Sequence, residues 1–182
     1  MKPSKQTEHY RGRIISVTTD EVRLPNGHLA SLEVVHHPGG AVAAAIDTDE
    51  RVCLLRQYRY VAGGWLWELP AGKLEPGEPP LLTAQRELIE EAGVRAATWR
   101  SLGSYLSSPG VFSEVLHLFL ATDLETAAVA HEPSEVIEVH WVAFAEACQW
   151  AESGEIRDGK TALGLLRARH MISADGSSAS PR

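Results

Sequence analysis

Two spacings of hydrophobic residues run along the chain, and each predicts a different kind of element. Short apolar runs bounded by turn residues predict strands, and these runs are 41–46, 51–60, 101–108, 115–122 and 136–142. Apolar positions three and four residues apart predict helices, which we place between Pro79 and Gly93, at 143–153 and at 160–171. Strands that alternate with helices indicate an α/β fold in which helices cover a mixed central sheet.

The chain before residue 39 predicts a separate β element. Segments 13–24 and 29–37 have strand character and flank a Pro-Asn-Gly turn, so we expect a hairpin there. A Pro-Gly-Gly break follows the second strand. The predicted organisation is an N-terminal β extension over 1–38, a main domain over 39–172 and a disordered, small and polar tail over 173–182.

Composition argues against several classes of function. The net charge of the 182-residue chain is −7 without a basic stripe, so we expect no nucleic-acid partner. No apolar run reaches the ~18 residues of a membrane span, and the polar start MKPSKQTEHY has no signal-peptide character. Cys53 and Cys148 lie in apolar surroundings without metal or redox spacing, so we expect buried thiols in a reducing cytoplasm.

The predicted helix between the prolines and Gly93 carries a cluster of acidic residues. Glu87, Glu90 and Glu91 are spaced i, i+3 and i+4, which puts their carboxylates on one helical face. Such a cluster is either a solvated acidic surface or a site for a hard cation, Mg²⁺ first and Mn²⁺ second. Arg86 favours the second interpretation, because it lies one turn before Glu90 and can hold that carboxylate in place.

The acidic cluster belongs to a longer pattern with a family resemblance. The pattern is Gly72-x5-Glu78-x7-Arg86-Glu87-Leu88-x-Glu90-Glu91-x-Gly93-Val94. It resembles the Nudix box and departs from that box at no fixed position. The resemblance implies a Nudix α/β/α sandwich. It also implies an enzyme that cleaves the diphosphate of a nucleoside diphosphate linked to another group.

Residues outside the box resemble the ADP-ribose pyrophosphatase branch of this family. The matching stretches are Gln57-Tyr58-Arg59, Trp67-Glu68-Leu69-Pro70-Ala71-Gly72, Pro109 at 15 residues past Val94 (109 − 94), and Ser113-Glu114. The resemblance implies that Arg59 contacts the diphosphate or a ribose, and that Glu68 lies on the substrate or metal side. It further implies that the Ala71 carbonyl is a metal ligand and that Glu114 contacts substrate, often from the partner subunit.

Some residues near this motif have two interpretations. Arg56 and Arg59 flank a tyrosine and belong either to an exposed strand edge or to the substrate site. Trp65 and Trp67 alternate along a short strand, so their rings share one face. They are either core residues or a platform on which a nucleobase stacks.

The resemblance also implies a mechanism. Glu87, Glu90 and Glu91, with the Ala71 carbonyl, would hold two or three Mg²⁺ ions, and Mn²⁺ would substitute. A glutamate of the acidic loop before residue 136, Glu135 or failing it Glu132, would serve as general base, with Glu90 as a further candidate. ADP-ribose would then give AMP and ribose 5-phosphate.

Other substrates and another class of function stay open at this point. The same box occurs in hydrolases of GDP-mannose, NADH, coenzyme A and dinucleoside polyphosphates, and a Nudix fold can also sense a nucleotide without cleaving it. In related enzymes the N-terminal hairpin pairs two chains, so we expect a homodimer.

Overall fold

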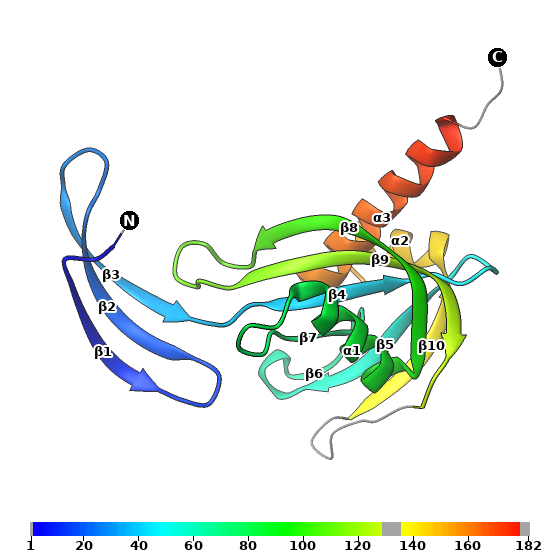
Figure 1. Cartoon of the computed structure of the whole chain (residues 1–182), viewed down its shortest axis with the longest axis horizontal. Helices are drawn as coiled ribbons and strands as arrows, with labels where there is room; N and C mark the ends of the chain where they lie inside the picture. The colour runs from blue at the N-terminus through cyan, green and yellow to red at the C-terminus, as the bar shows by residue number, and fades with distance from the viewer. Residues whose placement is uncertain (1, 129–135, 179–182) are drawn as a thin grey trace.

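A three-stranded antiparallel sheet at the N-terminus projects from the rest of the molecule (Figure 1). The computed structural model describes residues 2–128 and 136–178. The strands of this sheet are β1 (Lys5–Arg11), β2 (Ser16–Arg23) and β3 (Leu29–His36). β2 and β3 form the predicted hairpin. The prediction missed β1, because all of its residues are exposed and it therefore lacks an apolar alternation.

Two further sheets form the main body. Their strand orders are β7-β4-β9-β8 and β10-β5-β6. The strands are β4 (Gly40–Ala45), β5 (Arg51–Arg59), β6 (Gly64–Glu68), β7 (Ala71–Lys73), β8 (Val94–Leu106), β9 (Val115–Thr126) and β10 (Ile137–Ala143). β4 and β9 run parallel while β4 and β7 run antiparallel, so the first sheet is mixed, as predicted. A short 3₁₀ helix, η1 (Tyr60–Ala62), connects β5 to β6.

Helices pack on both faces of these sheets. They are α1 (Pro80–Ala92), α2 (Phe144–Ser153) and α3 (Gly159–Ser178). Alternate residues of β4 enter two different cores: Val42 and Ala44 share one with residues of α2 and α3, and Ala43 and Ala45 share the other with residues of α1. Because successive strand residues point to opposite faces, this division confirms the predicted α/β/α sandwich.

Two predicted strand boundaries are wrong, because strand pairing continues beyond the hydrophobic pattern. β8 begins at Val94, so residues 95–99 are strand rather than a connector. β9 continues to Thr126, which pairs with Val94, so 123–126 belong to the same ladder and not to a loop. Backbone hydrogen bonds of the antiparallel ladder join these two ends, and Ala96, Trp99 and Leu124 pack against the core beside α1.

The predicted disordered tail is also partly wrong. α3 continues to Ser178, and its C-terminal part extends beyond the sheets (Figure 1). Asp175, in this part of the helix, forms an ion pair with Arg100 of β8. Residues 179–182 lie outside the described part of the chain.

The cysteines are buried and free, as predicted. Burial, and then the nearby charge of Glu91, raises the pKa of the Cys53 thiol to about 12, so this thiol stays protonated at neutral pH. Within the described residues, no helix combines the length and the apolar character needed to cross a membrane.

Candidate active site

Helix α1 has the ends that its sequence predicts. Pro79 precedes the first turn in an extended conformation (φ −62°), and Gly93 ends the helix with φ 64° and a hydrogen bond from its N–H to the Ile89 carbonyl. Ala84 and Leu88 are fully buried against the sheets. This packing fixes the rotation of α1 and directs the opposite face, with its glutamates, toward a cavity.

Gly72 allows one of these glutamates to lie against the backbone of β7. A Cβ atom at position 72 would lie 1.8 Å from Glu87 Oε1, far inside van der Waals contact. Only glycine therefore leaves room for the Glu87 carboxylate in its present place. This contact gives a physical reason for the first glycine of the motif.

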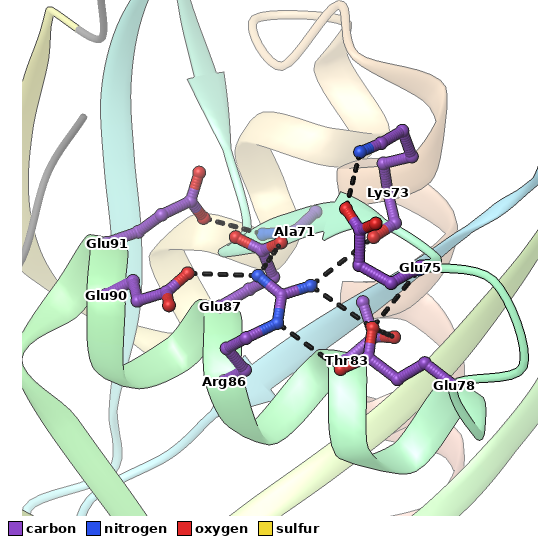
Figure 2. Close-up of polar contacts among 9 residues, drawn as sticks. All are labelled: Ala71, Lys73, Glu75, Glu78, Thr83, Arg86, Glu87, Glu90 and Glu91. Atoms are coloured by element: carbon purple, nitrogen blue, oxygen red, sulfur yellow. Dashed lines mark hydrogen bonds and ion pairs between the residues drawn. The ribbon is translucent and has the colours of Figure 1, made fainter. Parts of the chain in front are cut away.

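Arg86 lies at the centre of the acidic residues (Figure 2). Its Nη1 donates to Glu87 Oε1 at 2.7 Å and to Glu90 Oε2 at 3.0 Å. Its Nε and Nη2 donate to the two oxygens of Glu78, both at 3.3 Å. Hydrogen bonds from Arg86 and Thr83 lower the pKa of Glu78 to about 2, so this carboxylate is ionised at neutral pH. The predicted contact between Arg86 and Glu90 is confirmed.

Glu91 is held by a different donor. Its side chain is buried, and Glu91 Oε2 accepts a hydrogen bond from the Ala71 N–H at 2.8 Å (Figure 2). The contact ties the last turn of α1 to β7, in which Ala71 is the first residue. We call Glu78, Arg86, Glu87, Glu90 and Glu91 the acid-rich cluster.

The donors of the acid-rich cluster suit a hard divalent cation in type, because Mg²⁺ takes carboxylate and carbonyl oxygens. Their present arrangement differs from that of a loaded site. Among the residues that the structure describes, no three Asp, Glu, His or Cys side chains stand together as metal ligands. The Arg86 guanidinium contacts one oxygen of Glu87 and one of Glu90, so a bound cation would share these two carboxylates with Arg86 or displace it.

A second charged cluster lies between β5, β6 and α3. Arg59 donates from Nε and Nη2 to the two oxygens of Glu68, both at 2.8 Å. Lys160 donates to Glu68 Oε2 at 2.5 Å and to Asp158 Oδ2 at 3.0 Å. We call Arg59, Glu68, Asp158 and Lys160 the balanced cluster.

Glu68 is the buried centre of the balanced cluster, with a side chain only 2% exposed. Burial by itself would raise the pKa of Glu68, but the Arg59 hydrogen bonds and the Lys160 charge outweigh burial and lower this pKa to about 2. Glu68 does not line the cavity. Its contacts are with Arg59 and Lys160, which do line the cavity. Glu68 would therefore act on a substrate through these two residues rather than by direct contact.

One cavity of about 690 Å³ brings both clusters together. Its lining from the acid-rich and balanced clusters comprises Arg86, Glu87, Glu90, Glu91, Arg59, Asp158 and Lys160. Ala71, Gly72 and Glu114 also line it, so most of the predicted site residues meet in one place. Within the lining, Glu114 Oε1 lies 3.2 Å from His37 Nδ1.

Three predicted substrate residues lie elsewhere. Pro109, Arg56 and Trp67 are not part of the cavity lining. The Trp67 ring packs against Trp150, with 5.5 Å between centroids, and belongs to the edge of the core below α2 and α3. Arg56 lies over the ring of Trp67 at 5.8 Å. The packing interpretation of Trp67 thus accounts for its position.

Two predicted residues cannot be compared with the structure. Glu132 and Glu135, the candidate general bases, lie outside the described residues. Glu90, the further candidate, lines the cavity.

Sequence reasoning missed several lining residues. They are Arg13, Ile14, His37, Gln57, Lys73, Tyr105, Ser107, Asp158 and Lys160. Arg13 and Ile14 come from the connection between β1 and β2, and Lys160 lies in the first turn of α3. Among these missed residues, Gln57 could have been found from the sequence, because it belongs to the same Gln-x-Arg stretch as Arg59.

Comparisons with known proteins identify the family of the chain. The family model described as NUDIX domain matches residues 36–162. The chain is 39% identical to an ADP-ribose pyrophosphatase of Mycobacterium tuberculosis, over 90% of this chain and 80% of that protein. It is 36% identical to a methanol dehydrogenase activator of Bacillus methanolicus, over 90% of each. A crystal structure of an ADP compounds hydrolase has the same fold, with a TM-score of 0.82 over 97% of both chains at 21% identity. The chain belongs to the NUDIX family.

Proposed function

We propose that this protein is a cation-dependent pyrophosphohydrolase that cleaves the diphosphate of a nucleoside diphosphate sugar. ADP-ribose is the proposed substrate, with AMP and ribose 5-phosphate as products. The observation that carries the proposal is the single cavity whose lining contains both the acid-rich cluster and the cations Arg59 and Lys160. One group suits divalent cations, and the other suits the anionic diphosphate.

The proposed cofactor is Mg²⁺, two or three ions per site, with Mn²⁺ as a substitute. Glu87, Glu90 and Glu91 and the carbonyl oxygen of Ala71 would hold it. When bound, such ions offset phosphate charge and lower the pKa of a water molecule so that hydroxide forms near neutral pH. Gly72 supports this assignment, since it lets the Glu87 carboxylate lie against β7 in the lining of the cavity.

The protein's own residues would bind and orient the substrate. Glu68 holds the planar guanidinium of Arg59 by Nε and Nη2, and the other edge, formed by Nη1 and the second N–H of Nη2, suits bidentate binding of a phosphate. Glu114 would contact the sugar side. Glu135, with Glu132 or Glu90 as alternatives, would accept the proton of the attacking water.

The choice of ADP-ribose rests on similarity to the mycobacterial ADP-ribose pyrophosphatase and on the Gln57-to-Gly72 stretch. GDP-mannose, NADH and dinucleoside polyphosphates are the competing substrates. A sensor that binds without cleaving is the competing class of function. The complete acid-rich cluster favours an enzyme over a sensor.

A product assay tests the proposed function. Purified protein would be incubated with each candidate substrate in Mg²⁺ or in EDTA, and the products followed by chromatography and ³¹P NMR. We expect AMP and ribose 5-phosphate in equal amounts from ADP-ribose, only with Mg²⁺. Binding of ADP-ribose without release of AMP would contradict the enzyme and favour the sensor.

We also propose that the protein is a cytoplasmic homodimer joined through residues 1–38. The projecting β1–β3 sheet supports this, because it exposes large apolar side chains, Leu29 at 60% and Leu32 at 43%. Sedimentation equilibrium at micromolar concentration should give twice the chain mass. A monomer would contradict the dimer and leave the proposed chemistry untouched.

A further inference from the structure

Gln57 lines the cavity with a buried side chain. Its side chain lies on β5, two residues before Arg59, and the residue is 4% exposed. In the part of the chain that the structure describes, Gln57 Oε1 is the only buried side-chain nitrogen or oxygen without a hydrogen-bond partner. Arg59, Lys160 and Glu114, in the same lining, all have partners.

An unpaired buried acceptor costs folding free energy, so native proteins contain few of them. The polar side chain of Gln57 makes no hydrogen bond that would stabilise the fold through its amide oxygen. Its neighbours in the two adjacent strands are Ile137 of β10 and Leu66 of β6, which are apolar. A methionine or leucine would suit this strand position better unless a ligand completes the hydrogen bond.

The chemistry of the Gln57 amide oxygen limits which group of a ligand can bind to it. A carbonyl oxygen only accepts hydrogen bonds, and an ionised diphosphate has none to donate. The partner is therefore a hydroxyl or an amine. Side chains two residues apart on a strand lie about 7 Å apart on the same face. If Arg59 holds the diphosphate, this spacing places Gln57 near the adjoining sugar.

We infer that Gln57 is a substrate-binding residue whose amide oxygen accepts a hydrogen bond from a sugar hydroxyl next to the diphosphate. The inference rests on the proposed function for the class of substrate. It assigns Gln57 to sugar recognition, beside an arginine that binds the diphosphate.

The replacement Gln57→Met tests this, because methionine keeps the length of the side chain and removes the acceptor. For ADP-ribose we expect KM to rise about 10-fold with kcat within about twofold, as for a contact made equally in ground and transition state. The Tm of the unliganded variant should equal or exceed that of the wild type. An unchanged KM overturns the inference, and so does a lower Tm, which would make Gln57 a structural residue.

Matched controls separate loss of the contact from general damage. Gln149→Met makes the same change at an exposed position of α2, and should change neither KM nor Tm. Thr161→Val removes a buried hydroxyl that accepts from the Leu69 N–H at 2.7 Å and donates to Asp158 at 2.6 Å, and should lower Tm. The contrast with Gln57→Met then shows that only the unpaired group is free of a structural role.

Two ligands identify the group that Gln57 meets. IDP-ribose lacks the exocyclic amine of the base but keeps every sugar hydroxyl. In Gln57→Met, the KM for IDP-ribose should rise by the same factor as the KM for ADP-ribose. A rise in KM confined to ADP-ribose would assign the contact to the base and contradict the inferred contact with a sugar hydroxyl. Inorganic pyrophosphate has no sugar hydroxyl, so its inhibition constant should be unchanged. A rise there would indicate collapse of the diphosphate site instead.

The inference and the proposed function fail in different ways. A wild-type enzyme that cleaves ADP-ribose, with an equal KM in Gln57→Met, contradicts the inference alone. A wild-type protein that cleaves no nucleoside diphosphate sugar contradicts the proposed function. In that case the rise in Tm caused by ADP-ribose decides the inference, which requires a smaller rise in Gln57→Met than in the wild type and falls if the two are equal.

Discussion

The two charged clusters of the cavity are built from the same residue types in opposite proportions. In the acid-rich cluster one guanidinium, Arg86, contacts three of four carboxylates, and the formal charge of the five side chains is −3 (+1 − 4). In the balanced cluster two cations and two carboxylates cancel (+2 − 2), with Glu68 buried between Arg59 and Lys160. The acid-rich cluster therefore carries an excess of formal negative charge, and the balanced cluster is formally neutral.

This difference indicates what each cluster does. Residual negative charge around a half-exposed arginine favours the capture of divalent ions. A formally neutral cluster around a buried carboxylate instead holds a side chain in one orientation, at the expense of desolvating that carboxylate. Arg59 is thereby fixed in direction before a phosphate arrives, while Glu87 and Glu90 remain able to exchange Arg86 for a metal ion.

The largest expected effect concerns the acid-rich cluster. Glu91→Gln keeps the acceptor for the Ala71 N–H and removes one charge, so the fold should persist. We expect kcat for ADP-ribose to fall by about 10²–10³-fold, the typical effect of losing one electrostatic contact to the transition state. Steady-state kinetics with a circular dichroism control would measure this. Full turnover at saturating Mg²⁺ would remove Glu91 from the metal site.

Removal of the buried charge tests the balanced cluster. Glu68→Gln leaves Arg59 and Lys160 without a counter-charge, which should destabilise the fold by about 3 kcal/mol and lower Tm by roughly 10 °C. KM should also rise, because Arg59 loses its orientation. Adding Lys160→Met removes the surplus cation and should recover part of the Tm. If the double variant is less stable than Glu68→Gln, the two residues do not act as a pair.

Arg86→Met sharpens the comparison, because it turns the acid-rich cluster fully anionic. Four neighbouring carboxylates without a cation repel one another, so Tm in EDTA should fall by roughly 5 °C, or about 2 kcal/mol. Mg²⁺ should raise the Tm of this variant more than that of the wild type, since the ion replaces the lost charge. Differential scanning calorimetry measures both values. An equal response to Mg²⁺ in the two proteins would show that the ion binds elsewhere.

The smallest effect is an acid dependence shared by the two clusters. The pKa values of Glu68 and Glu78 are both about 2, below the ~4.3 of an unfolded glutamate. Their contribution to stability is therefore full above about pH 4.5 and is lost as the pH falls toward 2. Urea unfolding between pH 6 and 2.5 should show this loss. Glu78→Gln should be less stable at pH 6 and lose less on acidification.

Local signals made α1 and its charged face predictable. Proline at the start, glycine at the end and apolar residues on one side define the rotation of the helix, so the contact of Arg86 with Glu90 follows from the i, i+4 spacing. The contact of Gly72 with Glu87 was not deduced, because it depends on how closely β7 approaches α1. Spacing predicts which residues share a face but not the distance to the next element.

Contacts between distant parts of the chain could not be predicted. Lys160 reaches Glu68 across 92 positions, and nothing near Lys160 in the sequence indicates a buried partner. Trp67 has the spacing of a stacking platform, yet Trp150 of α2 covers it. β1 and the end of α3 were missed for a different reason: their residues are polar, and pairing with β2 or with Arg100 stabilises them without a hydrophobic pattern.

Mn²⁺ binding is the most direct test of the claim that the α1 face captures divalent ions beside a diphosphate. The EPR signal of free Mn²⁺ would be recorded while the ion is titrated into wild type and Glu91→Gln, each with a non-hydrolysable ADP-ribose analogue. We predict that the wild type removes two or three ions per chain from solution and that Glu91→Gln removes fewer. Equal free-ion signals for the two proteins, at every concentration, would contradict the metal site.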